Sequence, residues 1–220
     1  MATRIDYSPY TGREKRKAFT ESLTPESPLP SRGLTMAECR TIAKSLDDDD
    51  IEIGCIEDVI IRAIMIFSRR EPFCRKRERI ETLLPQLVSW MITDTVSSSL
   101  WYAKREEDEV YGYFLSLVSR THPMTRRLGI VALMDRDFLC PRHLDELLDT
   151  IADVRSEDYL LQMAVAWFFA TAYTYHPDES LPFFARLDDV IRKRAVRKCR
   201  ESRRITPHRL EALESFLERT

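Results

Sequence analysis

Apolar residues recur along most of the chain with the three-to-four-residue spacing of amphipathic helices. We expect helices over residues 12–23, 35–46, 55–69, 75–87, 87–100, 107–119, 123–135, 141–153, 157–175, 178–186 and 188–202. A further helix is predicted to begin at Thr206, because threonine is a favourable N-cap and Pro207 suits the first helical position. No segment carries the signal of a β-hairpin. The pattern predicts an all-α protein.

The N-terminal 30 residues differ from the rest. They are polar and contain four prolines, so we expect a short helix and a Pro-containing loop over residues 1–30. Thr35 then begins the next helix, with Glu38 at the position that completes a capping box. Residues 31–220 are predicted to form a single domain.

Helices of this length, joined by short turns, fit either a compact bundle or helix pairs stacked as a solenoid. The helices that contain Trp90, Arg127 and Trp167 recur at separations of 37 and 40 residues. This spacing is close to the ~40-residue period of HEAT-type repeats. We therefore predict HEAT-like repeats stacked as an α-α superhelix with a concave groove.

Composition and charge limit the classes of function. The chain has 220 residues, 44% of them hydrophobic and 32% charged, which suits many amphipathic helices. Its formal net charge of -2 argues against nucleic-acid binding, which favours a basic surface. The charges are unevenly distributed, however: residues 191–204 hold eight cations and one acid, and a second basic run covers 68–79. Acidic stretches at 47–50 and 105–109 offset them in the total.

Metal, redox and membrane functions find no support in the sequence. The five cysteines lie far apart, without a C-x-x-C pair, and the four histidines form no cluster, so we predict reduced thiols, no metal and no cofactor. No apolar run approaches the ~20 residues of a membrane span. The first residues lack the apolar core of a secretory signal, and a cytoplasmic protein is expected.

Three segments carry candidate functional side chains. Trp90 and Asp94 are four residues apart and therefore share one helix face. Each candidate also has a structural explanation: Asp94 as a solvated or hydrogen-bonded side chain, Trp90 and Trp167 as core, and Arg127 as a surface arginine with a buried stem. The segments alone do not decide between these interpretations.

The order of four segments, LVSWMITDTVSSSL, TRRLGIVALM, YLLQMAVAWFFATAY and LDDVIRKRAVRKCRESRRIT, resembles the DNA alkylation-repair family of HEAT-like-repeat proteins, which includes bacterial alkylpurine DNA glycosylases. The resemblance covers roughly residues 33–217. Its most specific pieces are MAVAW with the aromatic residues after it and the pattern RKCRESRR.

The resemblance assigns roles to individual residues. Asp94 matches the family's catalytic aspartate, Trp90 and Trp167 its groove tryptophans, and Arg127 its groove arginine. The resemblance further implies contacts with the DNA backbone by the basic residues of the C-terminal pattern, which are Arg194, Arg197, Lys198, Arg200, Arg203 and Arg204. The alternative interpretation of that segment is a solvated helix face.

The function so implied is an N-glycosylase that excises cationic N3- or N7-alkylated purines from duplex DNA, acting as a monomer in the bacterial cytoplasm near the nucleoid. The alternative is a non-catalytic module of the same architecture that binds DNA structures or a protein partner. The retained Asp94 favours the enzyme. One departure favours the alternative: the family's Gly-(Val/Ile)-Arg-x-Pro is replaced by residues 33–37, GLTMA, without the arginine and the proline.

Overall fold

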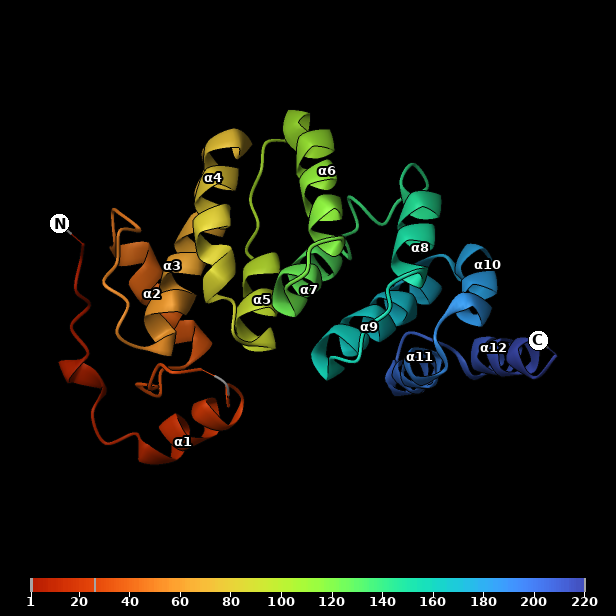
Figure 1. Ribbon diagram of the computed structural model, residues 1–220, viewed down its shortest axis with the longest axis horizontal. Helices are drawn as coiled ribbons and strands as arrows, with labels where there is room; N and C mark the ends of the chain where they lie inside the picture. Colours follow the sequence, from red (N-terminus) through yellow and green to blue (C-terminus); the bar gives the residue numbers. More distant parts are fainter. Residues whose placement is uncertain (1, 26, 220) are drawn as a thin grey trace. The chain divides into compact units, whose positions relative to one another are not determined.

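The structure, a computed structural model, describes residues 2–25 and 27–219, so Met1, Glu26 and Thr220 lie outside the described residues. Within these ranges the regular structure is helical, and the one β-type pairing is an isolated bridge between Thr3 and Ile51. The predicted all-α class is thereby confirmed (Figure 1). The stacking of the helices as a HEAT-like superhelix stays a prediction.

The chain divides into two compact units, Met1–Val110 and Tyr111–Thr220. The first contains η1 (Ser8–Tyr10), α1 (Glu14–Ser22), α2 (Met36–Ser45), α3 (Ile56–Ser68), α4 (Phe73–Leu83), η2 (Leu84–Gln86), α5 (Trp90–Ser97) and η3 (Lys104–Glu106). The division falls inside α6 (Glu107–Val118). The second contains α7 (Pro123–Ala132), α8 (Leu144–Ala152), α9 (Tyr159–Tyr175), α10 (Pro177–Ser180), η4 (Leu181–Arg186), α11 (Asp189–Glu201) and α12 (Pro207–Glu218).

The first unit is built around α3. All of this helix is buried except Arg62 and Ser68, and α2, α4 and α5 pack against it. A helix covered on several sides has little need of a polar face, which explains the nearly continuous apolar run from Val59 to Phe67.

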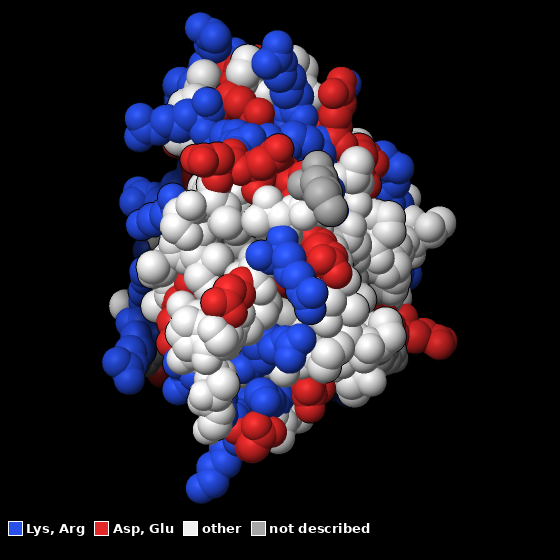
Figure 2. All heavy atoms as spheres, turned by 90° about the vertical axis from the view of Figure 1, so that its left-hand side faces the viewer, with Lys and Arg blue, Asp and Glu red and all other residues white. Residues whose placement is uncertain are grey.

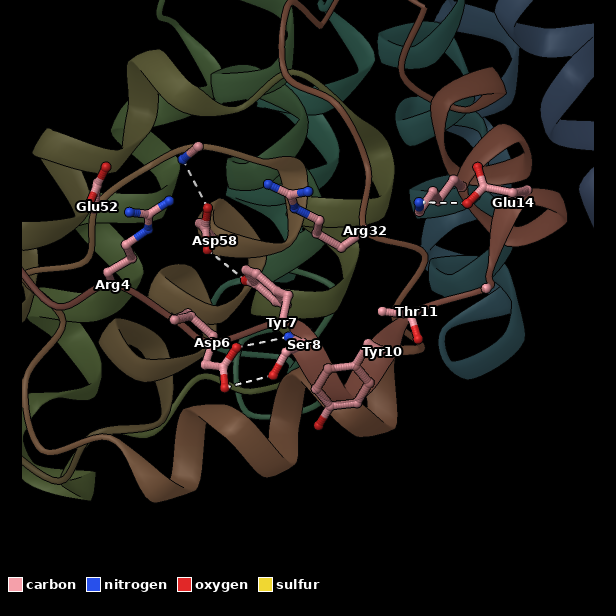
Figure 3. Close-up of a pocket in the computed structure, with 14 residues that line it drawn as sticks. Arg4, Asp6, Tyr7, Ser8, Tyr10, Thr11, Glu14, Arg32, Glu52 and Asp58 are labelled. Carbon is pink, nitrogen blue, oxygen red and sulfur yellow. Dashed lines mark hydrogen bonds and ion pairs between the residues drawn. The ribbon is translucent and has the colours of Figure 1, made fainter.

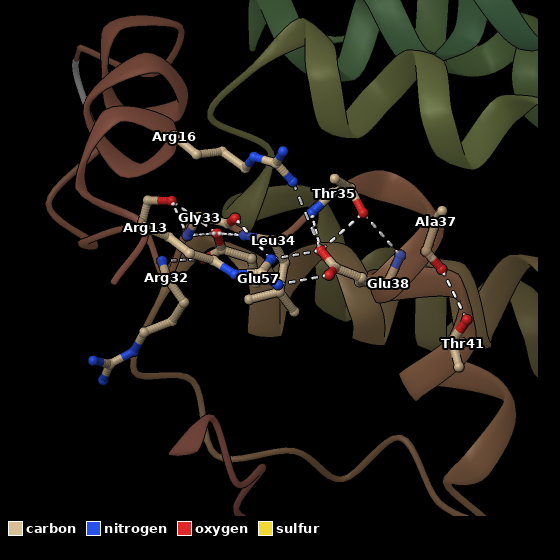
Figure 4. A network of polar contacts seen from close by, with 11 residues as sticks. Arg13, Arg16, Arg32, Gly33, Leu34, Thr35, Ala37, Glu38, Thr41 and Glu57 are labelled. Carbon is tan, nitrogen blue, oxygen red and sulfur yellow. Dashed lines mark hydrogen bonds and ion pairs between the residues drawn. The ribbon is translucent and has the colours of Figure 1, made fainter. Parts of the chain in front are cut away.

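A buried carboxylate ties the N-terminal segment to this core (Figure 4). Glu57, in the first turn of α3, is 1% exposed and accepts hydrogen bonds from the Ser31 hydroxyl and from the backbone amides of Arg32, Gly33 and Leu34, at 2.7–3.2 Å. The turn brings these donors together because Gly33 adopts a φ of 75°, in the left-handed region that favours glycine. The charge is further stabilised by the N-terminus of α3.

The second unit is built around α9, the longest helix of the described chain, with α7, α10 and α11 packed against it. Close approach of α6 and α7 depends on Gly129: a Cβ there would lie 2.7 Å from the carbonyl oxygen of Phe114 and 3.0 Å from the Cβ of Leu117. Backbone cannot give way as a flexible side chain can, so this position requires glycine.

Local signals set most helix boundaries. The capping box at Thr35 and Glu38 is confirmed, and the Thr206 side chain accepts from the Arg209 amide as expected for an N-cap. Two predicted helices, 75–87 and 178–186, change to 3-10 geometry before they end, at Leu84 and Leu181. In each case the next residue is a proline, which lacks an N–H and whose ring clashes with the preceding turn of an α-helix.

Candidate nucleic-acid interface

The predicted catalytic aspartate lies on α5, in the first unit. Asp94 and Trp90 are both half-buried and stand one helical turn apart, as their spacing predicted. The hydroxyl of the buried Thr93 lies 3.0 Å from Asp94 Oδ1 and 3.1 Å from the Trp90 carbonyl oxygen. Because a hydroxyl has a single proton, it can donate to only one of these acceptors at a time.

A serine fixes the start of α5 and hence the position of Trp90. Ser89 is fully buried, its hydroxyl accepts from the Met91 amide at 3.2 Å, and it lies within 3.3 Å of the Leu23 carbonyl oxygen, to which it can donate. This links α5 to the end of the N-terminal helix. On the face of α5 opposite Asp94, Ile92 and Val96 are buried, whereas Asp94 itself is partly accessible.

Arg127, the predicted groove arginine, lies on α7 in the second unit and is buried, with 5% of its surface exposed. Its Nη1 donates to the carbonyl oxygen of Leu160 at 2.6 Å. Leu160 belongs to the first turn of α9, so this bond fixes α9 relative to α7. Arg127 is therefore not a surface arginine with a buried stem.

Trp167, the predicted second groove tryptophan, is 41% exposed on α9. It belongs to a stripe of side chains at every fourth residue that are not buried, Tyr159, Met163, Trp167, Thr171 and Tyr175. Core packing therefore does not account for Trp167. Tyr159 and Tyr175 were not identified as candidates from the sequence, although their spacing of eight residues from Trp167 was visible there.

The basic helix α11 lies against α9 and carries most of the predicted backbone contacts. Arg197, Arg200, Arg203 and Arg204 are exposed, whereas Arg194 and Lys198 are half-buried. Glu201 accepts from Arg197 at 3.0 Å and from Lys198 at 2.8 Å, and these hydrogen bonds, with Lys198 contributing most, lower the pKa of Glu201. Arg200 pairs with Glu214 of α12 at 2.7 Å.

Two hollows lie along the contact between α9 and α11, and we call them together the α9–α11 furrow. One, of about 420 Å³, is lined by Trp167, Ala170, Thr171, Thr174, Tyr175, Lys198, Glu201, Ser202, Arg203 and Arg204. The other, of about 280 Å³, is lined by Tyr159, Met163, Arg194, Arg197, Lys198 and Glu201. Lys198 and Glu201 line both, so the two hollows are neighbours.

The second basic run, residues 68–79, is only partly exposed: Arg70, Arg75 and Arg77 reach the surface, whereas other cations of the run are buried or paired. Lys76 is fully buried, and its ammonium donates to the carbonyl oxygens of Phe67, Arg69 and Trp101 at 2.6–2.9 Å. Burial lowers the pKa of Lys76 to about 8. Arg79 is bound to carboxylates of the first unit. Figure 2 shows cations and carboxylates intermingled on the face that it presents.

A third hollow, of about 740 Å³, lies in the first unit beside the N-terminal segment (Figure 3). Its carboxylate Asp58 is held by the Tyr7 hydroxyl at 2.6 Å and by the amides of Gly54 and Cys55 at 2.9 Å. Burial and this hydrogen bond raise the pKa of Tyr7. Three cations and four carboxylates line the hollow, so it does not select for an anion.

No group of three or more His, Cys, Asp or Glu side chains among the described residues is placed to hold a metal ion. Within the same residues, no helix combines the length and the apolar character that crossing a bilayer needs.

Comparison with known proteins places the chain in a family. The sequence model of the DNA alkylation repair enzyme family matches residues 12–204, a range that contains Trp90, Asp94, Arg127, Trp167 and all six predicted backbone-contact residues of the C-terminal pattern. Searches of curated proteins and of solved structures found no match. The chain therefore belongs to the DNA alkylation repair enzyme family, which assigns it to DNA repair.

Proposed function

We propose that this protein is a monofunctional DNA glycosylase that excises cationic N3- or N7-alkylated purines from duplex DNA. The observation that carries the proposal is the family match over a range that contains Trp90 and Asp94, which the resemblance identifies with the family's groove tryptophan and its catalytic aspartate. In support, Asp94 is partly accessible on α5, with a hydroxyl beside it.

The reaction depends on a carboxylate and does not need a general acid. A purine alkylated at N3 or N7 carries a positive charge, so it leaves as a neutral base when the bond from C1′ to the base nitrogen breaks and its electron pair goes to the base. The deoxyribose becomes oxocarbenium-like, and an ionised Asp94 stabilises that cation and orients the water that adds to C1′. The proton released by the water passes to Asp94 or to solvent.

The remaining site residues serve binding in this proposal. The indoles of Trp90 and Trp167 offer electron-rich faces to the cationic lesion and sugar, an interaction of about 0.5–2 kcal/mol each. The six cations of the C-terminal pattern neutralise backbone phosphates, and Arg127 is assigned one phosphate by the resemblance. Arg127 is 5% exposed and donates to Leu160, so a contact with a phosphate requires this side chain to become accessible when DNA binds.

The altered segment at residues 33–37 supports the non-catalytic alternative. In place of the family's arginine stands Thr35, whose amide and hydroxyl both donate to Glu38 at 2.7–2.8 Å. Thr35 serves as the N-cap of α2, so the position of the family's arginine is occupied here by a residue with a structural role.

The direct test is release of free N7-methylguanine and N3-methyladenine from methylated duplex DNA, against a no-protein control for spontaneous depurination. We expect release above background by the wild type, none by Asp94→Asn, and wild-type release by the matched control Glu52→Gln, an exposed carboxylate of the same unit. Asp94→Asn should bind DNA as well as the wild type or better, because a repulsive charge is gone. Full activity of Asp94→Asn would overturn the assigned role, and no release together with tight, salt-sensitive binding would favour the non-catalytic alternative.

A further inference from the structure

A threonine occupies a fully buried position of α5, directly before Asp94. Thr93 is 0% exposed and is one of the three buried residues of this helix, with Ile92 and Val96. Valine has nearly the same shape as threonine, so packing alone does not require the hydroxyl. Burying a hydroxyl is unfavourable unless it forms a hydrogen bond, and this one is not exposed to solvent. The Thr93 hydroxyl therefore needs an acceptor within the protein.

Two oxygens lie within hydrogen-bond distance of this hydroxyl, the Trp90 carbonyl oxygen at 3.1 Å and Oδ1 of Asp94 at 3.0 Å. Trp90 is the first residue of α5, and its carbonyl group accepts from the amide four residues on, as in any α-helix. Oδ1 of Asp94 belongs to a carboxylate, and a hydrogen bond to an ionised acceptor is about twice as strong as one to a neutral acceptor. The single proton of the Thr93 hydroxyl is therefore donated to Asp94 when this carboxyl group is ionised.

The backbone that carries Thr93 and Asp94 is held at both ends of the helix. Ser89 caps the start of α5, and near its end the Ser97 hydroxyl donates to the Thr93 carbonyl oxygen at 2.7 Å. Because α5 has only eight residues, these contacts restrain most of it. The direction of the half-buried Asp94 carboxylate depends in addition on the two torsion angles of its side chain. The bond from Thr93 restricts these two angles.

We propose that Thr93 is a positioning residue of the reaction: its hydroxyl donates to Oδ1 of Asp94 and fixes the direction in which the carboxylate meets the developing sugar cation. This inference rests on the proposed glycosylase activity. Thr93 is buried, so it acts through Asp94 and not on the DNA. A hydrogen bond to the ionised form of a carboxyl group also favours ionisation, and the ionised form is the one that stabilises a cation.

The test compares three variants by the release of N7-methylguanine from methylated duplex DNA at several pH values. Thr93→Val keeps the shape of the side chain and removes the hydroxyl, so kcat should fall about tenfold while KM stays within about twofold of the wild type. The acid limb of its pH profile should move to higher pH. Thr93→Ser restores the hydroxyl and should recover most of kcat and the wild-type pH profile. The matched control Thr95→Val removes the hydroxyl of the half-buried threonine that follows Asp94, and it should behave as the wild type.

A second measurement follows the carboxyl group without using activity. In protein with ¹³C-labelled aspartate, the Asp94 Cγ signal, identified by its loss in Asp94→Asn, is recorded as the pH is lowered. Its titration midpoint should lie about 0.5–1 pH unit higher in Thr93→Val than in the wild type, and it should not move in Thr95→Val.

The two measurements separate the possible failures. Equal midpoints in the wild type and Thr93→Val, or full kcat in Thr93→Val, would overturn the proposal. A rise in KM as large as the fall in kcat would also overturn it, because a displaced α5 moves Trp90 as well as Asp94 and is then the cause. If the wild type releases no base, the glycosylase proposal fails, whereas the carboxyl titration still decides whether Thr93 holds Asp94.

Discussion

Replacing Glu57 by glutamine tests how the N-terminal segment is attached to the first unit. In the wild type, Oε1 accepts from the Ser31 hydroxyl and from the amides of Gly33 and Leu34, and Oε2 accepts from the Arg32 amide at 2.9 Å. A glutamine can keep its oxygen at the first position, but its NH₂ group then faces the Arg32 amide, donor against donor. The other bonds weaken because their acceptor is no longer charged.

The magnitude follows from these four bonds. One amide left without an acceptor costs about 1–3 kcal/mol, and each bond that loses its charged partner weakens by roughly 0.5–1 kcal/mol. These contributions sum to about 2.5–6 kcal/mol for Glu57→Gln, and the cost is larger for Glu57→Ala, which removes every acceptor. For a chain of this size, such a loss corresponds to a fall in Tm of about 5 °C or more.

Thermal unfolding followed by circular dichroism at 222 nm measures this effect. The matched control is Glu52→Gln, an exposed carboxylate four residues before α3, whose Tm should stay within about 2 °C of the wild type. The order expected is wild type and Glu52→Gln, then Glu57→Gln, then Glu57→Ala. A Glu57→Gln protein with the Tm of the wild type would refute the reasoning, because the carboxylate would then contribute no more than a neutral acceptor.

Three further predictions concern single side chains. Lys76→Met should lower the free energy of unfolding by about 3 kcal/mol in urea titrations, because three buried carbonyl groups lose their donor, whereas Arg75→Met on the exposed face of α4 should change it by less than about 0.5 kcal/mol. Gly129→Ala should cost about 1–3 kcal/mol by the same measurement, since its Cβ would meet backbone of α6, and an unchanged midpoint would contradict the close packing described. The Arg13 guanidinium and the Thr35 amide hold the pKa of Glu38 at about 2, below its unfolded value, so the stability that this group contributes is present above about pH 4.5 and is lost as the pH falls towards 2. After allowance for partial exposure, the difference between wild type and Glu38→Gln should be about 1 kcal/mol at pH 6 and should shrink steadily from pH 4.5 to pH 3.

Signals confined to one segment predicted the fold well. The apolar spacing gave the number and approximate extent of the helices, and Thr35 and Thr206 marked helix starts because a cap depends only on residues within one turn. The two predicted helices that change to 3-10 geometry contain Pro85 and Pro182, whose effect is equally local and was visible in the sequence.

Side chains whose role depends on distant partners were not predictable in the same way. Lys76 stands in a run of charged residues that indicated a basic surface, and only the folded chain brings the three carbonyl groups that accept from it to one place. The exposure of Tyr159 and Tyr175 depends likewise on where α11 lies against α9. The sequence showed an apolar helix, and its unburied stripe became apparent from the packing.

Arg127 is assigned two roles, binding a phosphate and fixing the start of α9. The family resemblance gives it a phosphate, and the structure gives it a bond to the first turn of α9, the helix that carries Tyr159 and Trp167. Replacing Arg127 would therefore disturb the α9–α11 furrow as well as any bond to a phosphate, and a fall in activity alone would not separate the two. The salt dependence of DNA binding does separate them. Removing one phosphate-binding cation reduces the slope of the logarithm of the binding constant against the logarithm of the salt concentration by about one, whereas a displaced helix weakens binding and leaves that slope unchanged.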